Sequence, residues 1–112
     1  MVKSMTLFKR KSGLTLEEFN RYWEEEHGPM VLKILPGVRR YVQSHVVDLG
    51  KGEPKYDGAA EVWFDSVESY KRAAEFYLSP KGQVIRDDEA RFIDKTRMLV
   101  IVVEERVMKE AP

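Results

Sequence analysis

The spacing of hydrophobic and polar residues differs from one segment of the chain to the next, and in four segments it predicts a β-strand. Residues 2–9 are short, partly alternating and end at a Lys/Arg/Ser/Gly turn. Residues 38–48 and 59–64 are rich in strand-forming residues, with side chains sorted by alternate position. Residues 97–104 are almost continuously apolar, which predicts a last strand that is covered on both faces.

Helical spacing follows the first strand. Thr15 and Glu18 have the spacing of a capping box, which predicts the start of a helix. We expect Gly28-Pro29 to interrupt this helix, because the residue before a proline is pushed away from helical dihedral angles. A new turn then runs over residues 30–35 and stops at Pro36-Gly37. The apolar stripe of the helix comprises Leu16, Phe19 and Trp23.

A second helical region lies between the third and fourth strands. Ser66 is the predicted cap, Ser79-Pro80 ends the helix, and a further helical stretch runs to about residue 94. The order β-α-β-β-α-(α)-β is typical of the ferredoxin-like split βαβ arrangement. We therefore predict a single α+β domain over residues 1–112, with a four-stranded antiparallel sheet. The stripe of the capped helix comprises Val67, Tyr70, Ala74 and Tyr77.

The two faces of the strand at 38–48 differ in character. Its even positions are mostly apolar and predict a dry surface, whereas its odd positions mix an aromatic ring with polar groups and fit a hydrated pocket. Helices cover one face of such a sheet, so a second copy of the chain is expected on the other face, giving a homodimer. The even positions are Val38, Arg40, Val42, Ser44 and Val46, and the odd ones are Arg39, Tyr41, Gln43, His45 and Val47.

The composition of the chain excludes several kinds of binding partner and several kinds of chemistry. The chain has 19 Lys and Arg against 19 Asp and Glu, so nothing attracts it to nucleic acid or to an anionic membrane, and neither is an expected partner. It contains no cysteine, which excludes a disulfide, a thiolate metal site and a catalytic thiol. No apolar run has the length of a signal peptide or membrane span, so we expect a cytoplasmic location.

Several stretches together carry a family resemblance. They are Phe8-Lys9-Arg10-Lys11, Phe19, Tyr22-Trp23, Glu26-His27-Gly28-Pro29, Pro36-Gly37, Arg40-Tyr41-Val42 and residues 58–65. This combination resembles the EthD-like family of dimeric α+β barrels. The resemblance implies a homodimer of ferredoxin-like protomers, each with a cleft between sheet and helices. The wider superfamily includes isomerases, lactone-processing enzymes, polyketide cyclases, decarboxylases and haem-degrading monooxygenases, so the resemblance carries the fold but not the reaction.

The two histidines are the candidate catalytic residues. His27 follows Trp23 by four residues and so continues its inward stripe; imidazole can act as general acid or base near neutral pH. Alternatively, its ring caps the interrupted helix. His45 shares the odd face of its strand with Tyr41 and Gln43, and the alternative is that it is simply half-exposed.

The third strand supplies two more candidates. Glu61 and Trp63 share one face, and we expect Trp63 to form a pocket wall. Glu61 needs a cationic partner or water, and Arg39 or Arg40 on the neighbouring strand is a suitable partner. Neither histidine has a carboxylate at a recognisable ligand spacing, so no metal site is predicted. The residues expected to contact substrate are Trp23, Gln43, Glu61 and Trp63.

These residues predict an enzyme that needs no cofactor. It would act on a small hydrophobic or aromatic carbonyl compound by isomerisation, cyclisation, dehydration or decarboxylation, with His27 transferring the proton and Tyr41 and His45 orienting the substrate. The alternative is a non-enzymatic dimeric protein that binds a small hydrophobic molecule, or serves as an accessory protein, in the catabolism of small organic compounds. A third hypothesis, monooxygenation with haem or without flavin, requires a pocket open to a large planar ring.

Overall fold

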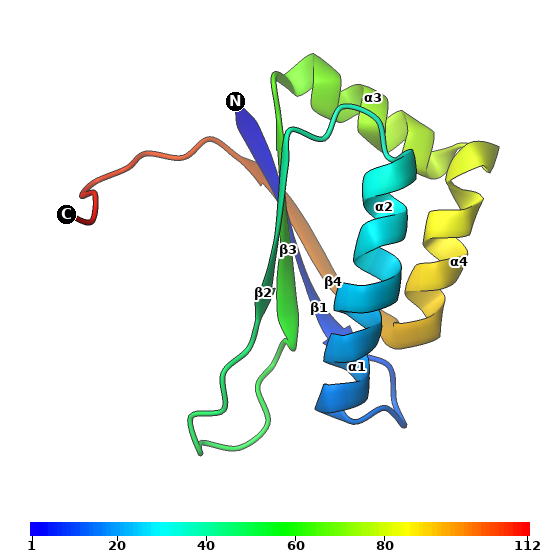
Figure 1. The fold of residues 1–112 in the computed structure, drawn as a ribbon, viewed down its shortest axis with the longest axis vertical. Helices are drawn as coiled ribbons and strands as arrows, with labels where there is room; N and C mark the ends of the chain where they lie inside the picture. Colours follow the sequence, from blue (N-terminus) through cyan, green and yellow to red (C-terminus); the bar gives the residue numbers. More distant parts are fainter.

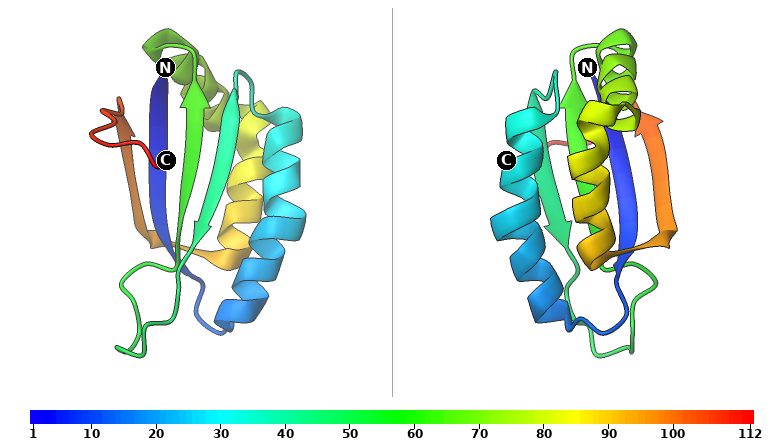
Figure 2. Two further views of the ribbon diagram at one scale, coloured as in Figure 1. Left: turned by 60° about the vertical axis from the view of Figure 1, so that its left-hand side comes forward. Right: turned by 90° about the vertical axis from the view of Figure 1, so that its right-hand side faces the viewer.

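The computed structural model describes residues 1–112 as one layer of helices packed on one sheet (Figure 1). The sheet is antiparallel, in the order β2-β3-β1-β4 (Figure 2). Its strands are β1 (Val2–Arg10), β2 (Arg40–His45), β3 (Gly58–Phe64) and β4 (Ile93–Val103). The helices are α1 (Leu16–Tyr22), α2 (Gly28–Ile34), α3 (Val67–Leu78) and α4 (Gln83–Phe92). This confirms the predicted α+β class and ferredoxin-like order of elements.

Both predicted helix caps are present. The Thr15 hydroxyl accepts from the Glu18 amide at 3.1 Å, and the Thr15 amide donates to the Glu18 carboxylate at 2.9 Å. The Ser66 hydroxyl accepts from the Ser69 amide at 3.1 Å. These bonds satisfy amides that have no partner inside the helix, and so they fix where α1 and α3 begin.

The predicted break at Gly28-Pro29 is wrong, because α1 and α2 form one column (Figure 1). They are joined by η1 (Trp23–His27), a π-helical turn in which the Gly28 amide donates to the Trp23 carbonyl five residues back. A proline ring in a regular helix clashes with the carbonyl four residues earlier. The wider turn just before Pro29 accommodates the ring, so the helix continues to Ile34.

Two strands differ from their predicted limits. β2 covers only 40–45, and Val38 before it packs against the buried cluster of Val62 and Phe64 on the helix side of the sheet. β4 begins at Ile93, and a bulge between Asp94 and Met98 shifts its register against β1. It is an edge strand whose residues 99–102 are 41 to 48% exposed, so the prediction of cover on both faces is wrong for a single chain.

The two faces of the sheet have different surroundings. The helices cover one face, and two apolar clusters centred on Phe19 and Phe64 form the core there. We call the other face the open face, and the C-terminal segment leaves the sheet on that side (Figure 1). None of the helices is both long and apolar enough to cross a membrane. The open face carries Lys3, Met5, Leu7, Arg40, Val42, Ser44, Ala59, Glu61, Trp63, Leu99, Ile101 and Val103.

Candidate functional site

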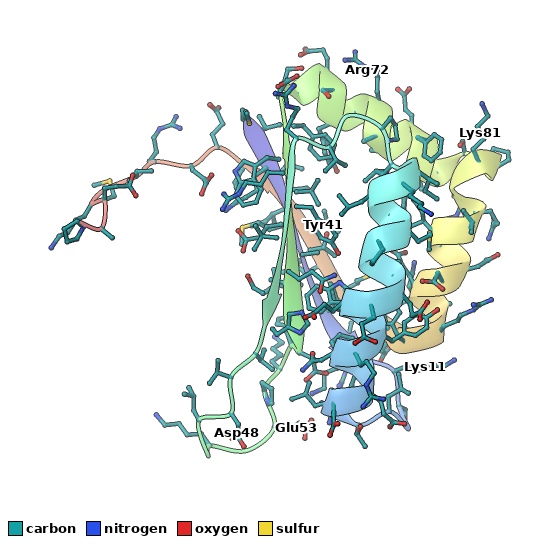
Figure 3. The ribbon with its side chains drawn as sticks, in the orientation of Figure 1. Lys11, Tyr41, Asp48, Glu53, Arg72 and Lys81 are labelled. Carbon is teal, nitrogen blue, oxygen red and sulfur yellow. The ribbon has the colours of Figure 1, made fainter.

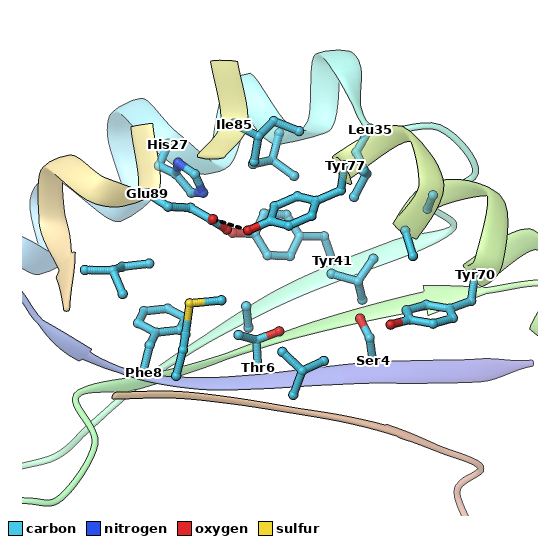
Figure 4. A pocket seen from close by; sticks show the side chains of 18 of the residues that line it. Ser4, Thr6, Phe8, His27, Leu35, Tyr41, Tyr70, Tyr77, Ile85 and Glu89 are labelled. Carbon is cyan, nitrogen blue, oxygen red and sulfur yellow. Dashed lines mark hydrogen bonds between the residues drawn. The ribbon is translucent and has the colours of Figure 1, made fainter. Parts of the chain in front are cut away.

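A cavity of about 210 Å³ lies between the sheet and the helices (Figure 4). Of its 20 lining residues, 16 are hydrophobic. The four others are Ser4 and Thr6 on β1, His27 on η1 and Glu89 on α4. Such a lining suits a small apolar ligand that is oriented by a few polar groups.

His27 is buried in the wall of this cavity, with its side chain fixed from behind. Its Nδ1 lies 2.7 Å from Oδ2 of Asp88, and its ring packs on Phe92 at 4.8 Å between centroids. The Tyr22 hydroxyl donates to the other oxygen of Asp88. Since a carboxylate only accepts, the proton of neutral His27 resides on Nδ1, and Nε2 keeps a lone pair. No group of the chain bonds to that Nε2.

The π-helical turn explains why His27 faces inward. Phe19, Trp23, His27 and Val31 are all buried and recur every four residues. A regular helical turn takes only 3.6 residues, so a four-residue repeat drifts around a regular helix. The wider turn reduces that drift and keeps all four side chains on the side that faces the sheet.

A hydrogen-bonded series on β2 presents Tyr41 to the same cavity. Nε2 of Gln43 donates to the Trp23 carbonyl at 3.0 Å and to the Tyr41 oxygen at 2.9 Å, and Oε1 of Gln43 accepts from His45 Nε2 at 2.9 Å. The hydroxyl proton of Tyr41 has no acceptor within the chain. Figure 3 shows Tyr41 between the sheet and the helices. A Cβ at Gly28 would lie 2.6 Å from Gln43 Nε2, so the glycine allows this approach.

Burial shifts the pKa of two members of this series, Tyr41 and His45. It raises the pKa of Tyr41, against hydrogen bonds from Gln43 and Trp23 that lower it, so the phenol remains a donor. Burial also lowers the pKa of His45, although the negative charge of Glu24 raises it. The lowered pKa favours the neutral ring. His45 stacks on Trp23 at 4.4 Å between centroids.

The predicted site residues divide into those that line the cavity, those that support it, and two that lie on the opposite face of the sheet. His27, Tyr41 and Trp23 line the cavity. Gln43 and His45 do not line it but form the hydrogen-bonded series that ends at Tyr41.

Glu61 and Trp63 require a correction, because both lie on the open face, across the sheet from the cavity. The register pairs Glu61 with Val42, and the side chains of both point away from the helices. The partner of Glu61 is Lys3 at 2.8 Å, not Arg39 or Arg40. The bond to Lys3 lowers the pKa of Glu61, and the bond to Glu61 raises the pKa of Lys3.

Arg39 and Arg40 have other neighbours. Arg39 lies 3.7 Å from Asp65, and the Arg40 guanidinium lies over the Trp63 ring at 4.3 Å from its centroid. Neighbouring strands cannot be matched face to face without their register, since a shift of one residue reverses every side chain.

Sequence reasoning missed Asp88, Glu89 and the polar role of Tyr77. Asp88 occupies the apolar stripe of α4, three residues after Ile85 and four before Phe92. A carboxylate within such a stripe is costly to bury without a partner, so it was a usable signal. Glu89 carries no comparable signal, because its neighbours Tyr77 and Lys95 come from other elements. No group of three or more His, Asp or Glu side chains is arranged to hold a metal ion.

Comparison with known proteins identifies relatives of this fold. The family model for the EthD domain matches residues 11–96. An ethyl tert-butyl ether D (EthD) family protein from Bacillus halodurans C-125 superposes with a TM-score of 0.71 at 23% identity, covering 95% of this chain and 99% of that one. An EthD-like protein from Ralstonia eutropha JMP134 gives a TM-score of 0.70 at 18% identity, with 96% and 94% covered.

A third structure is described as a dimeric protein of unknown function with a ferredoxin-like fold, from Bacteroides fragilis. Its TM-score is 0.63 at 16% identity, with 93% of this chain and 95% of that one covered. No curated protein matches the sequence significantly. At these identities the structures support the fold alone. The family model, however, spans most of the sequence, and the chain therefore belongs to the EthD family.

Proposed function

We propose that the cavity binds a small, largely apolar carbonyl compound and transfers a proton on it without a cofactor, with His27 as the proton-transfer residue. The observation that carries this proposal is the pair of His27 and Asp88, with one ring nitrogen bonded at 2.7 Å and the other without a partner in a mostly apolar cavity. A base oriented by a carboxylate is a recurrent arrangement for acid–base catalysis.

The proton and electron movements follow from this geometry. Nε2 of His27 takes a proton from the carbon beside the carbonyl. The C–H electron pair forms a C=C bond, and the π pair of the carbonyl moves onto its oxygen to give an enolate. Asp88 stabilises the imidazolium through Nδ1, and the free hydroxyl of Tyr41 donates to the enolate oxygen. Return of the proton to another carbon is an isomerisation, attack of the enolate carbon on a second carbonyl of the same molecule is a cyclisation, and loss of a hydroxyl group from the next carbon is a dehydration.

The test uses simple ketones as probes. Acetophenone and its ring-substituted relatives exchange the hydrogen atoms beside the carbonyl for deuterium, and NMR in D2O follows that exchange. We expect wild-type protein to accelerate exchange for at least one member, and His27→Gln to lower the rate by about 10²- to 10⁴-fold. An unchanged rate in His27→Gln would contradict the role of His27. Binding without exchange would favour the non-enzymatic binding protein.

We further propose that two chains pair through the open face. Leu99 and Ile101 are 48% and 46% exposed there, and an uncovered apolar sheet face suits a second copy. The Bacteroides fragilis relative is described as dimeric. We expect sedimentation to give twice the chain mass for wild type and a monomer for Ile101→Glu. Val67→Glu, at a similarly exposed apolar residue on α3, is the matched control and should remain dimeric.

A further inference from the structure

A second polar group on the cavity wall has no part in the proton transfer described above. Glu89 of α4 lines the cavity, and its side chain is only 12% exposed. Its Oε1 accepts from the Tyr77 hydroxyl and from the Lys95 ammonium, and Lys95 also lies 3.2 Å from the Tyr77 oxygen. Figure 4 shows Glu89 meeting Tyr77 on the helix side of the cavity, with His27 and Tyr41 nearby.

These bonds satisfy one oxygen of the carboxylate and leave the other. Burial and the bond to Glu89 raise the pKa of Tyr77, so its hydroxyl stays protonated and continues to donate to Oε1. Lys95 supplies the positive charge that balances the buried carboxylate. No group of the chain donates to Oε2 of Glu89. A half-satisfied carboxylate in an apolar wall is a ready acceptor for a ligand O–H.

Two polar groups of the cavity thus have complementary hydrogen-bonding capacity that the chain itself does not use. The hydroxyl of Tyr41 can donate a hydrogen bond, whereas Oε2 of Glu89 can accept one. A carbonyl oxygen fits the first group and a hydroxyl fits the second. A carboxylate on the ligand would instead be repelled by Glu89, and its charge would be poorly solvated among 16 hydrophobic lining residues.

We propose that Glu89 binds a hydroxyl group of the substrate, so that the site selects small uncharged compounds bearing both a carbonyl and a hydroxyl group and rejects carboxylates. This inference rests on the proposed function for the placement of the carbonyl at Tyr41. Glu89 is here a specificity residue that contacts the substrate, held in position by Tyr77 and Lys95. The neighbouring Asp88 bonds to His27 and does not line the cavity, so of these two consecutive residues of α4 only Glu89 contacts the ligand.

The experiment compares matched pairs of probes by titration calorimetry. The pairs are the three positional isomers of hydroxyacetophenone and the corresponding methoxyacetophenones, which keep the ring and the carbonyl but lack the O–H donor. For at least one isomer, we expect wild-type protein to bind the hydroxy compound about tenfold more tightly or better. The corresponding acetylbenzoic acid should bind more weakly than either.

Two variants of Glu89 and one control complete the test. Glu89→Gln keeps the shape but removes the charge, and should reduce the hydroxyl preference to about threefold or less. Glu89→Leu should abolish it, and thermal unfolding of each variant reports whether the fold is intact. Glu75→Gln, an exposed substitution of the same kind on α3, should keep the full preference.

The outcomes separate this inference from the proposed function. Equal binding of hydroxy and methoxy probes by wild type, no binding of any probe, or a preference that survives in folded Glu89→Leu would overturn the role of Glu89. Deuterium exchange that depends on His27 would meanwhile still support proton transfer. A hydroxyl preference that depends on Glu89, without any exchange, would support this inference and contradict proton transfer alone.

Discussion

The two faces of the sheet treat polar side chains in opposite ways. On the open face, Lys3 bonds to both Glu61 and Glu105, Glu105 also accepts from Trp63, and Arg40 lies over the Trp63 ring. Each of these polar groups thus has a partner within the chain. In the cavity beneath the helices, His27 Nε2, the Tyr41 hydroxyl proton and Oε2 of Glu89 each have no partner. A fully paired network stabilises one arrangement of side chains, whereas unpaired hydrogen-bond donors and acceptors in an apolar cavity are available to a ligand.

The two tryptophans, one on each face, give the largest test of this contrast. Trp23 is 1% exposed, packs edge-on against Phe8 at 4.9 Å between centroids and stacks with His45. We expect Trp23→Ala to lower the free energy of unfolding by about 3–5 kcal/mol, because it leaves a cavity in the core. Trp63 is also buried, at 8% exposed, but the flexible side chains of Lys3 and Arg40 cover its ring and can collapse into the space it leaves, so Trp63→Ala should cost less. Urea unfolding measures both, and an equal cost would contradict the contrast.

Asp88→Asn removes the carboxylate behind the proposed base and leaves the cavity lining unchanged. The asparagine amide can donate to Nδ1 of His27, which would place the proton on Nε2. We expect the ketone exchange rate to fall by about 10- to 100-fold. Glu61→Gln is the matched change on the open face and should leave the exchange rate as it was. Equal rates in wild type and Asp88→Asn would show that Asp88 does not orient the base.

The ion pair of the open face should affect stability in a pH-dependent way. Glu61→Gln leaves Lys3 with only its contact to Glu105, and we expect a loss of about 1–2 kcal/mol at pH 7. The pKa of Glu61 is lowered in the folded protein, so its contribution is complete above the unfolded value of ~4.3. It disappears as the pH falls through the folded value. Urea unfolding from pH 7 to 3 should therefore show wild type and variant converging, whereas Glu75→Gln should track wild type throughout.

His45 should give the smallest effect. Because burial lowers the pKa of His45 in the folded chain, the unfolded chain takes up the proton first as the pH falls. Its contribution to stability is therefore complete above the unfolded value of ~6.5 and is lost as the pH falls from there toward the folded value. Thermal unfolding should show wild type losing more stability than His45→Gln between pH 8 and 5. Parallel curves would mean that His45 has the same proton affinity in both states.

The parts of the fold that depend on local chemistry could be predicted from the sequence. The capping box at Thr15, the cap at Ser66 and the alternation in β2 and β3 act within a few residues, and they gave the order of elements. His27 could be identified because its spacing from Trp23 is local.

The parts that depend on register or on distant segments could not be predicted. The face occupied by Glu61 is fixed by its pairing with Val42 and Met5. The roles of Asp88 and Glu89 need α4 to lie beside η1 and α3, a contact that links residues 61 and 12 positions apart. The exposed edge strand β4 resembles a buried strand in sequence, because its apolar residues are the same whether the chain or a copy of it supplies the cover.

The π-helical turn makes the length of one segment more important than its composition. Residues 24–26 are three exposed glutamates, and their identities can vary at little cost. Their number cannot vary, because deletion of one residue would close the wide turn into a regular one, in which the Pro29 ring clashes with the carbonyl four residues earlier. Among variants of this chain, insertions and deletions in these three positions should be selected against far more strongly than substitutions.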